Sequence, residues 1–193
     1  MSATGKYEVN NQPIEVILAW LTSGEIAIPE IQRPFVWDTT KVRDLLDSQY
    51  QGYPIGYLIA WQNPKVRLKD GQESYGKKVL IDGQQRVTAL AAAVLGKQIV
   101  LSDYRKTRIK ISFNPRDQRF EVFNPAIEND VSWIPDVSPL YTGDANLLSI
   151  LKSYVSANPG VDEEKVFGTL QKLLSIKRKQ IGILELAHDL DID

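Results

Sequence analysis

The sequence predicts an α+β protein in which a small mixed sheet with flanking helices is followed by a helical region from about residue 140. Three patterns predict this class. An apolar run at residues 79–81 enters a glycine turn, apolar residues alternate with polar ones from Arg108 to Phe113, and apolar residues three or four positions apart recur at 147–154 and 166–174. We therefore expect a sheet-containing domain at residues 1–139 and a helical extension at residues 140–193, which ends in a strand and is expected to be truncated.

The first half of the chain is expected to alternate helices with short strands. Glycine and proline mark most of the boundaries, and Asp38 or Thr39 is suited to cap the second helix. In chain order we expect a helix at 13–24, a strand at 26–28, a loop at 32–37, a helix from 38 or 39, strands at 55–61 and 66–68, and a central strand and helix at 79–96.

The second half begins with a hairpin and then becomes mostly helical. Ile109, Ile111 and Phe113 point to one side of a strand, and the turn at 114–117 returns the chain through Phe120. After an irregular segment we expect helices at 147–154 and 162–174 and a last strand at 181–186.

The composition limits the kinds of partner that the protein can have. The chain has 193 residues, a formal net charge of −1, no cysteine and one histidine. These values argue against disulfides, thiolate chemistry and a nucleic-acid binder that uses its whole surface. Because no apolar run approaches the roughly 18 residues of a membrane span and the N-terminus has no signal core, we expect no membrane partner and a cytoplasmic location.

The most informative segment joins the central strand to its helix. Asp82, Gly83, Gln84, Gln85 and Arg86 follow the apolar strand, and a helical face of apolar residues follows them. Free backbone N–H groups at the start of a helix favour anions, and an arginine in the first turn adds a fork of donors. The segment therefore suits a phosphate of a nucleotide or nucleic acid.

A purely structural interpretation of the same segment is equally compatible with its spacing. Asp82 has the chemistry of an N-cap residue, and Gln85 stands where the second member of a capping box would stand. The two interpretations are compatible, because a capped helix end can still line a pocket.

Two other groups of residues are candidates for ligand contacts. Gln32, Arg33 and Trp37 combine an amide, a guanidinium and a ring that can stack on a base, although the aromatic residues can equally fill a core. Arg105, Lys106 and Arg108 form a local basic stretch that can contact DNA phosphates, although such stretches are usually solvated surface.

Three segments together resemble the N-terminal domain of GmrSD-type restriction enzymes, a branch of the ParB/sulfiredoxin-like fold. The segment at 81–90, with Asp-Gly-Gln-Gln-Arg at its centre, is similar almost residue for residue to the family's most specific element. Residues 32–37 match its Gln-Arg-Pro-aromatic-x-Trp element, and residues 53–56 precede its second strand. The resemblance covers residues 10–125 well and the helical remainder loosely.

The resemblance implies a ParB-like nucleotide-binding domain that binds and hydrolyses a nucleoside triphosphate with Mg²⁺ and senses modified DNA in bacterial defence against phage. It places the nucleotide at Gly83, Gln84, Gln85, Arg86 and Thr88, with Gln32 and Arg33 nearby. It implies catalytic roles for Asp82 and Arg86, and DNA contacts from Arg33, Trp37 and the basic stretch. Nuclease activity is expected in a separate C-terminal domain or subunit, which is absent from this chain.

Other catalytic chemistries have little support in the sequence. His188 lacks partners for a zinc site or a serine triad, and the chain has no P-loop. A carboxylate at a phosphate site usually holds Mg²⁺ or orients water, which makes Asp82 the metal candidate. The alternatives are a DNA-binding or protein-docking module with a non-hydrolysing pocket and, with less support, a nuclease in its own right.

Overall fold

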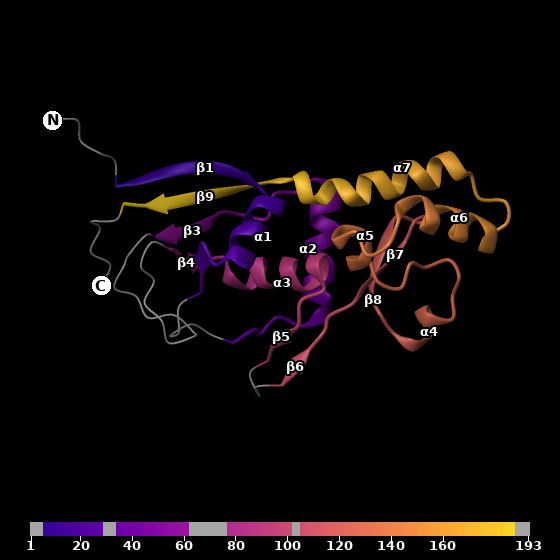
Figure 1. The fold of residues 1–193 in the computed structure, drawn as a ribbon, viewed down its shortest axis with the longest axis horizontal. Coiled ribbons are helices and arrows are strands. Elements are labelled where there is room, and N and C mark those ends of the chain that lie inside the picture. Colours follow the sequence, from indigo (N-terminus) through magenta and orange to yellow (C-terminus); the bar gives the residue numbers. More distant parts are fainter. Residues whose placement is uncertain (1–5, 29–33, 62–76, 102–104, 188–193) are drawn as a thin grey trace.

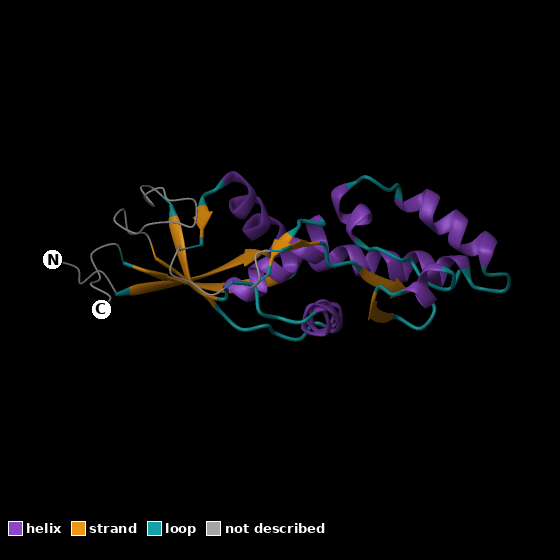
Figure 2. Cartoon of the chain, turned by 90° about the horizontal axis from the view of Figure 1, so that it is seen from below, coloured by secondary structure: helices purple, strands orange, loops and turns teal. Residues whose placement is uncertain are grey.

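The protein is described by a computed structural model that covers residues 6–28, 34–61, 77–101 and 105–187. Figures 1 and 2 show an elongated molecule, with a five-stranded sheet at one end and a helical region at the other. The predicted α+β class is confirmed. The strand expected at residues 66–68, the residues Gln32, Arg33 and Tyr104, and the single histidine lie outside the described residues.

The sheet has the strand order β1-β9-β3-β4-β2. Its strands are β1 (Tyr7–Pro13), β2 (Ile26–Ala27), β3 (Leu58–Trp61), β4 (Lys78–Asp82) and β9 (Gln180–Leu186). The β1–β9 and β3–β4 pairs are antiparallel, whereas β3–β9 and β2–β4 are parallel. The last strand thus lies between the first and third, and the helical region is inserted into the chain between strands of one sheet.

Three helices share one hydrophobic core with the sheet. They are α1 (Ile14–Ser23), α2 (Thr39–Gln51) and α3 (Gln84–Leu95), and Asp38 caps α2 by accepting from the backbone N–H of Lys41 at 2.8 Å. Buried side chains of the sheet, such as Leu58 and Leu80, join apolar residues of these helices in a core that continues into the helical region. Burial of this apolar surface holds α3 and its preceding turn in place.

The rest of the chain extends this core. It contains the strand pairs β5 (Ile99–Val100) with β6 (Lys106–Thr107) and β7 (Ile111–Asn114) with β8 (Arg119–Val122), the helices α4 (Pro125–Glu128), α5 (Ser138–Thr142), α6 (Leu147–Ala157) and α7 (Glu163–Leu174), and the 3-10 turn η1 (Ser175–Arg178). The β7–β8 hairpin and both long helices agree with the sequence prediction, whereas α4 and α5 lie in the segment expected to be irregular. Within the described residues, no helix is both long enough and apolar enough to cross a membrane.

The strand β1 was not expected from the sequence. Its residues 7–11 are exposed and mix polar with apolar side chains, so no alternation marks a buried face. Pairing of all seven residues with β9 forms the strand instead. Pro13 therefore ends a strand and precedes α1, rather than occupying the first turn of that helix.

Candidate functional site

The turn between β4 and α3 depends on a glycine conformation. Gly83 has φ +89° and is the residue immediately before α3, so Asp82 belongs to the strand. No side chain caps α3, and the Asp82 carboxylate instead accepts from Nη2 of Arg86 at 3.1 Å. The predicted capping box of Asp82 with Gln85 is therefore wrong, because Gly83 takes the cap position and both side chains bind other groups.

The two glutamines fasten α3 to its surroundings. Gln84 is buried, and its Nε2 donates to the carbonyl oxygen of Leu80 in the preceding strand. Gln85 accepts from the backbone N–H of Val36 at 3.0 Å and donates to the carbonyl oxygen of Pro34 at 3.1 Å. One amide side chain thus pairs with the backbone of the 34–36 loop as a neighbouring strand would.

The Arg86 guanidinium fastens a second loop. Its Nη1 donates to the carbonyl oxygen of Ile55 at 2.6 Å, and its Nη2 donates to that of Tyr57 at 2.7 Å as well as to Asp82. Gly56 lies between the two carbonyls with φ +85°, and a Cβ there would stand 2.6 Å from Nη1. A guanidinium has five N–H groups, so these three hydrogen bonds leave two for a ligand.

Asp82 and Arg86 differ in their access to solvent. The Asp82 side chain is 64% exposed, whereas that of Arg86 is 17% exposed. Asp82 can therefore reach a metal ion or a water molecule, while its carboxylate accepts a hydrogen bond from the less exposed Arg86. The backbone N–H groups of residues 84–86 have no acceptor in the described part of the chain, which leaves the positive end of the helix dipole open.

A cleft of about 380 Å³ runs beside the first turns of α3. Its lining includes Gln84, Gln85 and Thr88 of α3, together with Phe35 and both residues of β5. A mostly apolar cleft with a few fixed polar groups is typical of small-molecule sites. The structure thus places three of the predicted site residues on one cleft and leaves Asp82, Gly83 and Arg86 outside its lining.

The segment at 34–37 lies against the same helix. Pro34 and Val36 contact Gln85, and Trp37 is half-buried and packs against the core. Trp37 therefore has the structural role that the sequence left open, while part of its ring remains accessible. The proposed contacts of Gln32 and Arg33 with a ligand stay predictions, because these residues lie outside the described ranges.

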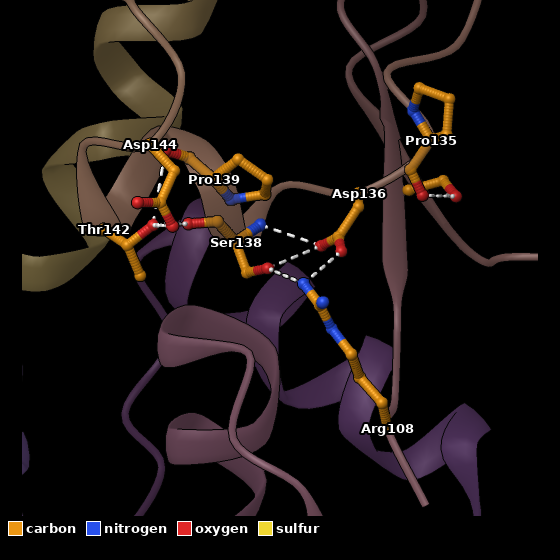
Figure 3. A network of polar contacts seen from close by, with 8 residues as sticks. Arg108, Pro135, Asp136, Ser138, Pro139, Thr142 and Asp144 are labelled. Carbon is orange, nitrogen blue, oxygen red and sulfur yellow. Dashed lines mark hydrogen bonds and ion pairs between the residues drawn. The ribbon is translucent and has the colours of Figure 1, made fainter.

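The basic stretch divides into two parts. Arg105 and Lys106 are exposed at the β5–β6 pair. Arg108, in contrast, donates from Nη2 to Asp136 at 2.8 Å and to the Ser138 hydroxyl at 3.0 Å. Figure 3 shows both contacts at the start of α5. The contacts of Arg108 give it a structural function, although 44% of its side chain is exposed.

The site has one carboxylate for a metal ion. Among the described residues, no group of three or more histidine, cysteine, aspartate or glutamate side chains could hold one. Mg²⁺ is often bound through one or two carboxylates together with phosphate oxygens of the substrate. Asp82, exposed beside an open helix start, fits this shared mode of binding and does not fit an all-protein metal site.

Sequence reasoning missed the backbone partners of Gln85 and Arg86. These partners lie 29 to 51 residues away along the chain, so no local spacing indicates them. The glycine at position 56, directly after Pro54 and Ile55, was the one available sign that the backbone there approaches another group.

Comparison with known proteins agrees with the resemblance noted from the motifs. Residues 14–187 match the family described as the GmrSD restriction endonuclease, N-terminal domain. An uncharacterized protein of Methanocaldococcus jannaschii is 29% identical over 97 residues, which cover 43% of this chain and 17% of that protein. The chain therefore spans less than a fifth of this relative's length.

Proposed function

Because the chain belongs to the family of GmrSD restriction endonuclease N-terminal domains, and so is part of a restriction system, we propose that it binds and hydrolyses a nucleoside triphosphate with Mg²⁺. The observation that carries the proposal is the exposed Asp82 carboxylate just before the uncapped start of α3, a helix whose residues Gln84, Gln85 and Thr88 line a cleft. An uncapped helix start favours phosphate, and a nearby carboxylate can share Mg²⁺ with it.

The proposed roles follow from the contacts of each side chain. Asp82 holds Mg²⁺, which offsets negative charge on the transferred phosphoryl group when it is bound. Arg86 orients Asp82 and directs its two remaining N–H groups to phosphate. The amides of Gln84 and Gln85 and the hydroxyl of Thr88 line the cleft for the rest of the nucleotide, with Gly83 allowing close approach of the backbone.

Phosphate release from the four common nucleoside triphosphates, with Mg²⁺ and with or without DNA, tests the proposal. Removing the carboxylate charge in Asp82→Asn is expected to lower turnover by about a hundredfold, because a lost metal contact raises the barrier by several kcal/mol. Glu128→Gln, at an exposed carboxylate on α4, is the matched control and should retain full turnover.

The outcomes separate the candidate functions. Nucleotide binding without turnover in the folded wild-type chain would favour a non-hydrolysing DNA-binding or docking module, and DNA nicking by the purified chain would favour a nuclease. Equal turnover in Asp82→Asn and wild type would contradict the proposed role of Asp82.

We also propose that DNA, the substrate of a restriction system, contacts the exposed Arg105 and Lys106, with base stacking at Trp37 and a further phosphate contact from Arg33. We further propose that the protein senses a modification of the DNA. A nuclease domain or subunit then cuts this DNA. Since few cations take part, affinity should be weak, with a slope of log K against log salt of roughly −3 to −4, at about −0.9 for each phosphate contact.

Charge reversal tests this surface. Arg105→Glu with Lys106→Glu should flatten the salt slope by nearly two units in anisotropy titrations of a labelled duplex, since about two phosphate contacts are lost. Lys152→Glu, at an exposed lysine of α6, should leave the slope close to its wild-type value. If the double reversal leaves both affinity and slope unchanged, DNA contacts lie elsewhere.

A further inference from the structure

A second cavity within the described residues lies away from the proposed nucleotide site. It is a groove of about 630 Å³ between the turn that joins β7 to β8, the connection from α6 to α7, and one side of α7. Its volume is within the range of about 300–1,000 Å³ that small-molecule sites occupy. Neither the family match nor the motifs of the sequence assign a role to it.

The charges along this groove favour an anion. Arg116, Lys165 and Lys172 line it, and Asp162 is the one carboxylate among its described lining residues. Asp162 is already engaged as the cap of α7, accepting from the backbone N–H of Lys165 at 3.2 Å. Nζ of Lys165 lies 3.8 Å from Oδ2 of the same Asp162, whereas Arg116 and Lys172 form no ion pair with a described residue.

One end of the groove is held in position by a buried tyrosine. The Tyr50 side chain is 1% exposed, and its hydroxyl donates to Oε1 of Gln118 at 2.9 Å. Nζ of Lys172 lies 3.9 Å from the centre of the Tyr50 ring, a cation–π distance. Gln118 has φ +51°, so this contact also fixes a residue in a backbone conformation that side chains rarely adopt. Two lining residues are thus preorganised by the same ring.

A glycine in the middle of α7 keeps the opposite wall open. Glycine is among the least favourable residues inside a helix. A Cβ on Gly168 would meet no atom within 4 Å, so close packing does not require the glycine. Its effect is to leave free space on the side of the helix that lines the groove, between the positions of Lys165 and Lys172.

We propose that this groove binds a phosphate-bearing ligand, with Arg116, Lys165 and Lys172 as the groups that contact the phosphate. Two sources share this chemistry, a free nucleotide and the backbone of a nucleic acid. The proposal is independent of the nucleotide site at Asp82, since no residue lines both cavities.

Two substitutions at Gly168 test the proposal with side chains of similar length and opposite charge. In the full 193-residue chain, Gly168→Glu should weaken binding at least tenfold, whereas Gly168→Lys should weaken it much less or strengthen it. The double variant Arg116→Gln, Lys172→Gln should also lose at least tenfold, because each charge-assisted hydrogen bond contributes about that factor. The probes are ATP, followed by calorimetry, and a labelled 12-base-pair duplex, followed by anisotropy.

Controls separate binding from folding and from the other site. Gly168→Ala should raise the melting temperature by about 2–4 °C, because alanine favours the helix and no atom obstructs it. Asp82→Asn should leave unchanged the part of the probe binding that is lost in the groove variants. Loss for ATP identifies a nucleotide, and loss for the duplex alone identifies a nucleic-acid backbone. Equal affinities of Gly168→Glu and Gly168→Lys for both probes would overturn the proposal.

Discussion

Replacing Arg86 by alanine is expected to lower the free energy of unfolding by about 3 kcal/mol. The substitution removes two charge-assisted hydrogen bonds to the carbonyl oxygens of Ile55 and Tyr57, each of which typically contributes about 1.5–3 kcal/mol. It also leaves both carbonyls without the donor that holds the loop. Urea unfolding followed by circular dichroism measures the change, with the midpoint shifted and the slope retained.

Two further variants make this expectation specific. Arg86→Lys keeps the charge, but an ammonium group cannot donate in a fork to two carbonyls, so an intermediate loss is expected. Arg43→Ala is the matched control, because Arg43 pairs with the carboxylates of Asp44 and Glu121 near the surface. Such pairs contribute about 0–1 kcal/mol.

The result decides how loss of nucleotide affinity in Arg86→Ala is to be interpreted. If the variant is as stable as the wild type and loses only affinity, the guanidinium acts mainly on the ligand. If stability falls as expected, lost affinity follows at least in part from movement of the loop. Asp82→Asn, which removes an exposed charge and keeps the shape of the side chain, is then the better test of phosphate chemistry.

The local part of the site could be predicted from the sequence. An apolar strand, a glycine and a helix with an apolar face were enough to place β4 and α3 and to end α3 at Gly96. Hydrophobic periodicity indicates which residues of an element face the core. For α3 the pattern needs only residues of that one helix. The hairpin was predicted for the same reason, since Ile111, Phe113 and Phe120 are all buried.

The partners of the polar residues could not be predicted in this way. Asp82 and Gln85 have the spacing of a capping box, yet the positive φ of Gly83 starts the helix one residue later. Gln85 and Arg86 then bind backbone atoms of loops that lie 51 and 31 residues away in the sequence. Two side chains of the motif thus hold distant segments of the chain, a function that short-range spacing does not encode.

Pairing between distant strands likewise could not be predicted from local sequence patterns. β1 is mostly exposed and lacks an alternating apolar face, and its ladder with β9 makes it a strand. Because β9 follows the helical region and enters the sheet between β1 and β3, the sheet joins chain segments nearly 180 residues apart. This strand order cannot be predicted from the order of elements along the sequence, because it depends on backbone hydrogen bonds between remote residues.

Gly83→Ala is expected to destabilise the protein by about 2–5 kcal/mol, in two separable parts. A non-glycine residue at φ +89° costs about 1–2 kcal/mol. In addition, the new Cβ would overlap Cδ2 of Leu58 and stand 3.2 Å from Nη2 of Arg86. Leu58 is fully buried in the core, so it cannot move aside without a further cost of about 1–3 kcal/mol.

Gly143→Ala separates the two parts. Gly143 ends α5 with φ +84°, but a Cβ there would meet nothing within 4 Å. Its alanine variant should therefore show the backbone cost alone, about 1–2 kcal/mol. The difference between the two variants in urea unfolding measures the overlap with Leu58. Equal losses would mean that the turn has room for a side chain. The close approach of β3 and Arg86 to Gly83 would then not explain the glycine at this position of the motif.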